Sequence, residues 1–109
     1  MSAYVILIKH HTLKPDELDT YASLAKLARA GHNPKPIAYY GEIEVLEGQP
    51  EESVAVLEFP DMAAARNWYE SPAYQKAKPH RNAGADYSVL LVNGVASAAI
   101  SHEQEASKP

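Results

Sequence analysis

Three stretches of this chain are apolar without the alternation of a one-sided strand, and they restrict its fold more than any other feature. Two of them, Val5–Ile8 and Val89–Val92, are apolar at every position. Aliphatic and β-branched residues favour strands, and strands without alternation are covered on both faces. We therefore expect strands of this kind at Ala3–His11, Ser53–Phe59 and Tyr87–Val92.

A first helix is expected between the first two strands. Pro15 suits the first helical position, and Asp16 and Glu17 complement the positive end of the helix. Gly31 is a natural stop. The predicted core face carries Leu18, Tyr21, Leu24, Ala25 and Ala28.

A second helical region follows the third strand. Asp61 is a good N-cap for a helix over Met62–Glu70. Ser71 and Pro72 then mark a second start, as N-cap and first helical residue. We expect this second helix to be short, because Pro79 interrupts it.

The remaining strand is predicted over Ile37–Leu46, where residues of high strand propensity alternate with glutamates. A polar turn over Glu47–Glu52 joins it to Ser53–Phe59, and the two strands read as a β-hairpin. Glu42, Glu44 and Glu47 are then a solvated strand face and turn.

The resulting order is β-α-β-β-α-β, which predicts an α+β, ferredoxin-like domain over residues 1–94. Two helices cover only one face of a four-stranded antiparallel sheet, so its second apolar face needs another cover. A second copy of the sheet is the simplest, and we expect a two-fold homodimer. Residues 95–109 form a tail, in which Val95–Ile100 is apolar enough to dock, for instance on the partner subunit.

Composition excludes several classes of function. The net charge is −4 and the basic residues are scattered, so we expect no nucleic-acid partner. The first apolar run stops at Lys9 and has no basic segment before it, which indicates neither a signal peptide nor a membrane span. The chain has no cysteine and no H-E-x-x-H spacing. We expect a cytoplasmic protein without a metal or a cofactor.

Several motifs resemble the domain of unknown function 1330 family over about Ala3–Gly94. They are Val56-Leu57-Glu58-Phe59-Pro60, Ala64-Ala65-Arg66-Asn67-Trp68-Tyr69, Ser71-Pro72-Ala73-Tyr74-Gln75 and Leu90-Leu91-Val92-Asn93-Gly94. The resemblance implies a dimeric α+β barrel and supplies no activity. Two segments depart from the family pattern: Gly31–Pro36 replaces a glycine pair, and Tyr39-Tyr40-Gly41 replaces an Arg-Gly-Gly turn.

Four aromatic residues are candidates for a ligand pocket between sheet and helices, namely Tyr40, Trp68, Tyr69 and Tyr74. Aromatic residues at helical spacing are also typical of a core, so Trp68 has a purely structural alternative. The same alternative holds for Tyr69 and Tyr74, whose hydroxyls need partners if they are buried.

Three charged or titratable residues are candidates for the chemistry. Arg81 suits the binding of a carboxylate, or else forms a structural ion pair. His80 suits proton transfer, because histidine is the residue type that changes charge near neutral pH, or else it is a surface residue. Glu58 lies in a predicted central strand, where it is a base, a partner of Arg81, or a side chain that reaches water at the strand end.

Three functions stay open at this point. The first is binding of a small, anionic organic ligand. The second is a cofactor-independent monooxygenase or isomerase, by analogy with proteins of similar fold. The third is a structural or interaction module without chemistry.

Overall fold

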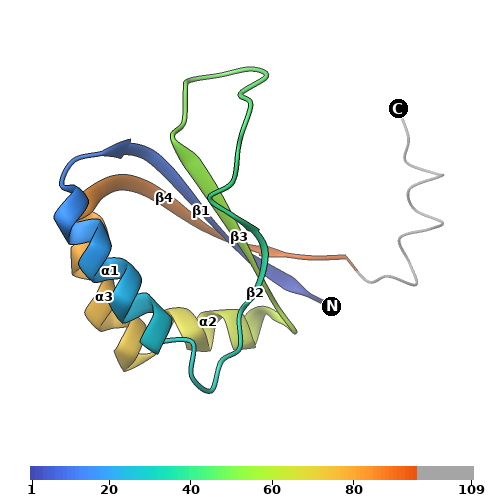
Figure 1. The fold of residues 1–109 in the computed structure, drawn as a ribbon. Helices are drawn as coiled ribbons and strands as arrows, with labels where there is room; N and C mark the ends of the chain where they lie inside the picture. Colours follow the sequence, from blue (N-terminus) through green and yellow to red (C-terminus); the bar gives the residue numbers. More distant parts are fainter. Residues whose placement is uncertain (96–109) are drawn as a thin grey trace, which may run out of the picture.

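The computed structural model describes residues 1–95 as a four-stranded antiparallel sheet with three helices on one of its faces (Figure 1). The strands are β1 (Ala3–Thr12), β2 (Lys35–Tyr39), β3 (Ser53–Phe59) and β4 (Ala85–Asn93), in the order β2-β3-β1-β4. The helices are α1 (Pro15–Leu27), α2 (Met62–Glu70) and α3 (Pro72–Gly84). The predicted α+β, ferredoxin-like fold is confirmed.

The core lies between the helices and one face of the sheet. Alternate residues of β1 and β3 point into it, and their neighbours point to the opposite face. The buried set from these two strands is Ala3, Val5, Leu7, Ala55, Leu57 and Phe59. Trp68 from α2 and Tyr74 from α3 fill the space beneath them.

Local signals set the helix starts as predicted. The Asp61 carboxylate accepts a hydrogen bond from the Ala64 amide at 2.7 Å, and the Ser71 hydroxyl accepts one from the Tyr74 amide at 3.2 Å. The Lys14 position before α1 has no side-chain cap, as its residue type indicates.

The predicted interruption of α3 at Pro79 is wrong. The helix continues through Pro79 to Gly84, although proline has no N–H to donate to the preceding turn. Ala77, Arg81 and Gly84 are buried on the continued helix, which packs along α1. This tertiary packing outweighs the local cost of the proline.

The predicted strand over Ile37–Leu46 is also wrong in its extent. β2 ends at Tyr39, because Tyr40 adopts a left-handed backbone with φ 57°. The hairpin with β3 exists, but residues 40–52 form a long connection outside the sheet. The end of this connection attaches to β1 instead, where the Glu52 amide donates to the Lys9 carbonyl at 2.9 Å.

Within residues 1–95, no helix covers the other face of the sheet (Figure 1). Ile6 in β1 lies opposite Val56 of β3 and Leu90 of β4, so apolar side chains adjoin one another across three strands. Leu90 and Val92 are 45% and 40% exposed. We call this surface the open sheet face.

The predicted tail lies outside the described residues from position 96 onward. The docking expected for Val95–Ile100 therefore stays a prediction. Within residues 1–95, none of the helices combines the length and the apolar character that crossing a membrane requires.

The contact between α1 and α3 depends on Gly84. A Cβ atom at this position would lie 2.6 Å and 2.8 Å from two side-chain carbons of Leu18 and 3.0 Å from its backbone nitrogen. We expect Gly84→Ala to lower the free energy of unfolding by about 1–3 kcal/mol, because one helix must shift. Urea denaturation followed by circular dichroism measures this loss.

Gly41→Ala is the matched control, since a Cβ atom at Gly41 meets no atom of residues 1–95 within 4 Å. We expect it to leave stability nearly unchanged. Equal effects of the two substitutions would show that the close helix contact at Gly84 is not a determinant of stability.

Candidate functional site

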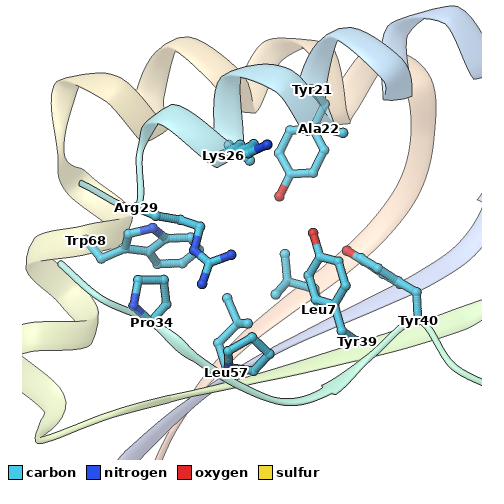
Figure 2. Close-up of a pocket in the computed structure, with 12 residues that line it drawn as sticks. Leu7, Tyr21, Ala22, Lys26, Arg29, Pro34, Tyr39, Tyr40, Leu57 and Trp68 are labelled. Carbon is cyan, nitrogen blue, oxygen red and sulfur yellow. The ribbon is translucent and has the colours of Figure 1, made fainter. Parts of the chain in front are cut away.

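A pocket of about 290 Å³ opens between α1, β2 and the helix-covered face of the sheet (Figure 2). We call it the α1–β2 pocket. One wall comes from α1, the opposite wall from β2 and the residues around it, and the floor from β1, β3 and α2. The lining residues are Tyr21, Ala22, Ala25, Lys26 and Arg29; Pro34, Pro36, Tyr39 and Tyr40; and Leu7, Leu57 and Trp68.

The α1 wall follows from helical spacing. Tyr21, Ala25 and Arg29 are four residues apart and therefore lie on one face of the chain as it leaves the helix. Ala25 is small and leaves space between the two long side chains. Lys26 and Arg29 are exposed, and within residues 1–95 neither forms an ion pair. Figure 2 shows the guanidinium of Arg29 extending into the pocket beside Trp68.

The opposite wall is marked by an unusual backbone. Tyr40 has a φ of 57°, a conformation that bulky residues rarely adopt and that costs about 1–3 kcal/mol. The Tyr40 hydroxyl lies 3.1 Å from the Tyr87 hydroxyl, which holds its ring at the pocket. Figure 2 shows the hydroxyls of Tyr21, Tyr39 and Tyr40 converging on the same region.

We call the three pocket tyrosines, Tyr21, Tyr39 and Tyr40, the tyrosine wall. A buried polar cluster lies behind it. The Tyr21 and Tyr74 hydroxyls are 2.8 Å apart, and Nη1 of Arg81 donates to the Tyr74 hydroxyl at 3.0 Å. The Arg81 guanidinium also lies over the Tyr87 ring, 5.6 Å from its centroid. Burial raises the pKa of Tyr21, Tyr40 and Tyr74, so all three hydroxyls stay protonated at neutral pH.

Arg81 is only 5% exposed, yet no carboxylate of residues 1–95 pairs with it. Its Nη2 donates to the side-chain oxygen of Asn82 at 3.1 Å, and its Nε has no hydrogen-bond partner in the described part of the chain. A buried cation is usually paired with an anion. Here tyrosine oxygens and an aromatic ring take that role, so positive charge lies behind the pocket.

The structure separates the predicted aromatic candidates into three places. Tyr40 and Trp68 line the pocket, and Tyr74 lies behind it, fully buried. Tyr69 does not line this pocket but a second one of about 280 Å³. Its ring packs against Tyr74 with a centroid distance of 5.3 Å, and Nζ of Lys78 lies 5.5 Å from its centroid.

His80 and Glu58, the two candidates for proton transfer, do not line the pocket. Nδ1 of His80 lies 2.6 Å from a carboxylate oxygen of Glu17, in a pair that joins α3 to α1. Glu58 lies opposite Tyr4 and Lys35 in the sheet, on the open face, so it does not pair with Arg81. Within residues 1–95, no three His, Asp or Glu side chains gather in a way that suits a metal ion.

Of the lining residues, sequence reasoning named only Tyr40 and Trp68 as pocket candidates. The polar residues that it missed are Tyr21, Lys26, Arg29 and Tyr39. A signal for the α1 residues existed, because Arg29 continues the spacing of Tyr21 and Ala25 beyond the predicted core face. The two segments that depart from the family pattern supply the opposite wall, through Pro34, Pro36, Tyr39 and Tyr40.

Solved structures of similar fold come from several bacteria. The RPA0582 protein of unknown function from Rhodopseudomonas palustris is 18% identical, with a TM-score of 0.67 over 87% of this chain and 83% of that chain. SnoaB from Streptomyces nogalater, a cofactor-independent oxygenase, is 11% identical, with a TM-score of 0.55 over 88% and 94%. A dimeric protein of unknown function and ferredoxin-like fold from Bacteroides fragilis NCTC 9343 is 10% identical, with a TM-score of 0.53 over 85% and 96%.

At these identities the likeness establishes the fold alone. No curated protein matched the chain. The model of the domain of unknown function family DUF1330 matches residues 2–95, which span β1 to the end of β4 and include every wall of the α1–β2 pocket. The chain therefore belongs to the DUF1330 family.

Proposed function

We propose that this protein binds a small organic anion, such as a substituted aromatic carboxylate, in the α1–β2 pocket. The observation that carries the proposal is the charge on the α1 wall. Lys26 and Arg29 both line the pocket, and within residues 1–95 neither is neutralised by a carboxylate. The planar guanidinium of Arg29 matches a carboxylate in a two-point contact.

The rest of the lining supports an aromatic or aliphatic ligand body. Leu7, Leu57 and Trp68 form an apolar floor, and two prolines and two alanines continue it along the walls. Small-molecule sites are mostly apolar with a few convergent polar groups, and their volumes begin at roughly 300 Å³. The pocket has this composition and a volume of about 290 Å³.

The sole tryptophan of the chain lies in the floor and provides a direct readout of binding. We expect benzoate to change Trp68 fluorescence in a saturable way, and the neutral isostere benzamide to bind about 10-fold or more weakly. Arg29→Ala is expected to weaken benzoate binding by about 10–100-fold, because a hydrogen bond to a charged group contributes about 1.5–3 kcal/mol. Fluorescence titration of each probe measures both effects.

Arg66→Ala is the matched control, since Arg66 is an exposed helical arginine that does not line the α1–β2 pocket. It is expected to bind benzoate as the wild type does. If both substitutions weakened benzoate binding equally, the cause would be the general loss of positive charge and not a contact with Arg29. If no carboxylate probe binds at all, the aromatic cluster is purely structural and the proposal fails.

An enzyme is the alternative, since SnoaB has a similar fold and is a cofactor-independent oxygenase. Taking a proton from a substrate requires a positioned base. The lining contributed by residues 1–95 contains no His, Asp or Glu, and burial raises the pKa of Tyr21 and Tyr40. We therefore favour binding without turnover. Oxygen consumption with a bound phenolic acid would reverse this preference.

We also propose that the protein is a two-fold homodimer joined through the open sheet face. Ile6, Val56 and Leu90 adjoin one another there, and no described element covers them. Monomeric proteins rarely expose contiguous apolar patches of more than several hundred Å². The Bacteroides fragilis protein of similar fold is described as dimeric, which supports this assembly. The α1–β2 pocket lies on the opposite side of the sheet and stays accessible.

A further inference from the structure

The direction of the hydrogen bonds behind the tyrosine wall defines one end of the α1–β2 pocket. The chain of contacts runs from Arg81 to Tyr74 and from Tyr74 to Tyr21, with distances of 3.0 Å and 2.8 Å. Arg81 has only donors, so the Tyr74 oxygen is the acceptor in the first contact. Tyr74 then has one hydroxyl hydrogen left to place.

Burial decides where that hydrogen goes. Tyr74 is completely buried, and within residues 1–95 its hydroxyl has no partner besides Arg81 and Tyr21. If Tyr21 donated to Tyr74, the Tyr74 hydrogen would be left without an acceptor, which costs about 1–3 kcal/mol. The Tyr74 hydroxyl therefore donates to Tyr21. Tyr21 lines the pocket, so its own hydrogen is free to point into it.

Building on the proposed function, we infer that the tyrosine end of the pocket is a fixed hydrogen-bond donor, and that the ligand presents a carbonyl or similar accepting oxygen to Tyr21 while its carboxylate meets Arg29. The ligand class is thus an organic acid with a second, accepting oxygen at the end opposite its carboxylate. Arg81 is a positioning residue: it does not line the pocket, but it sets the direction of the hydrogen bond between Tyr74 and Tyr21.

Spacing along α1 supports two separate recognition points. Tyr21 lies in α1 and Arg29 lies two residues beyond its end, so the two are eight residues apart, a separation of roughly 12 Å at helical rise. Figure 2 shows the Arg29 guanidinium on the Trp68 side and the tyrosine hydroxyls on the other side, with Leu7 and Leu57 beneath the space between them. A planar body that separates two oxygen-bearing groups fits this arrangement.

Two probes of matched shape test the inference. 4-Acetylbenzoate carries the accepting oxygen opposite its carboxylate, whereas 4-isopropylbenzoate has the same outline without that oxygen. We expect the wild type to bind 4-acetylbenzoate about 5–10-fold more tightly, as a single directed hydrogen bond allows. Isothermal titration calorimetry of both probes gives this selectivity ratio.

Tyr21→Phe removes the donor and is expected to lower the ratio to about 1. Tyr74→Phe keeps the shape of the core but interrupts the series of hydrogen bonds that starts at Arg81. It is expected to lower the selectivity ratio to about 2–3. The affinity for 4-isopropylbenzoate should stay within about 2-fold of the wild type in both variants. A purely structural role of Tyr74 would alter both affinities together and leave the ratio unchanged.

The outcomes separate this inference from the proposed function. Equal binding of both probes, with binding still dependent on Arg29, would overturn the donor end and leave the anion site in place. An unchanged ratio in Tyr21→Phe would overturn the role of Tyr21, and an unchanged ratio in Tyr74→Phe would overturn the positioning by Arg81. Binding of neither probe would overturn the proposed function and this inference with it.

Discussion

Replacing Trp68 by alanine is expected to lower the free energy of unfolding by about 3–5 kcal/mol. Trp68 is 3% exposed, and its ring packs on Tyr74 and Phe59 with centroid distances of 4.4 Å and 5.4 Å. It thus links α2 to α3 and to β3. A loss of this size is a large share of the roughly 5–15 kcal/mol that stabilises a domain. Urea denaturation followed by far-ultraviolet circular dichroism measures it without relying on the removed fluorophore.

Trp68→Phe is the control, because it keeps an aromatic ring at the same place. The buried Nε1 of Trp68 has no hydrogen-bond partner within residues 1–95, so phenylalanine also removes an unsatisfied donor. We expect the loss in this variant to be below about 2 kcal/mol. A loss near zero in Trp68→Ala would mean that this side chain lines the pocket without supporting the core.

The parts of the fold that sequence predicted well depend on local chemistry. Asp61 and Ser71 accept hydrogen bonds from amides three residues ahead, so the start of each helix is determined within one turn. The strand over Ser53–Phe59 is bounded by a polar turn and by Pro60-Asp61, and its predicted limits match the structure.

The errors arose where distant residues decide the outcome. Pro79 predicts an interruption, but the packing of Ala77 and Arg81 against the rest of the core keeps α3 continuous. The alternation after Ile37 predicts a long strand, but Tyr40 adopts a left-handed backbone conformation that ends it. The Tyr40 hydroxyl is hydrogen-bonded to the hydroxyl of Tyr87, which is 47 residues away. Neither contact is visible in a local pattern.

The candidate site shows the same division. Aromatic residues could be selected by type, and Tyr40 and Trp68 do line the pocket. The charged residue chosen by type, Arg81, lies behind the pocket, whereas the pocket arginine is Arg29. The difference depends on how α1 faces β2, and only the tertiary structure provides that relation.

The strands that are apolar on both faces lead to the second prediction with a large expected effect. Ile6 lies at the centre of the open sheet face, in β1 between β3 and β4. We expect Ile6→Asp to weaken the proposed dimer by about 1,000-fold or more, because two-fold symmetry places two carboxylates in one apolar interface and each costs several kcal/mol. We expect the monomer to stay folded, because Ile6 lies on the open sheet face and is only partly buried. Sedimentation velocity at about 1–100 μM compares the oligomeric state of the wild type with that of the variant.

Leu13→Asp is the matched control, because Leu13 is 57% exposed and lies outside the sheet, between β1 and α1. It adds the same charge and removes a similar apolar side chain, so it should leave the dimer intact. Circular dichroism should show both variants folded. A wild type that sediments as a monomer at micromolar concentration, or an Ile6→Asp variant that stays dimeric, would exclude the open sheet face as the interface. In the first case another partner must cover this face, because its apolar side chains from three adjoining strands remain in contact with water.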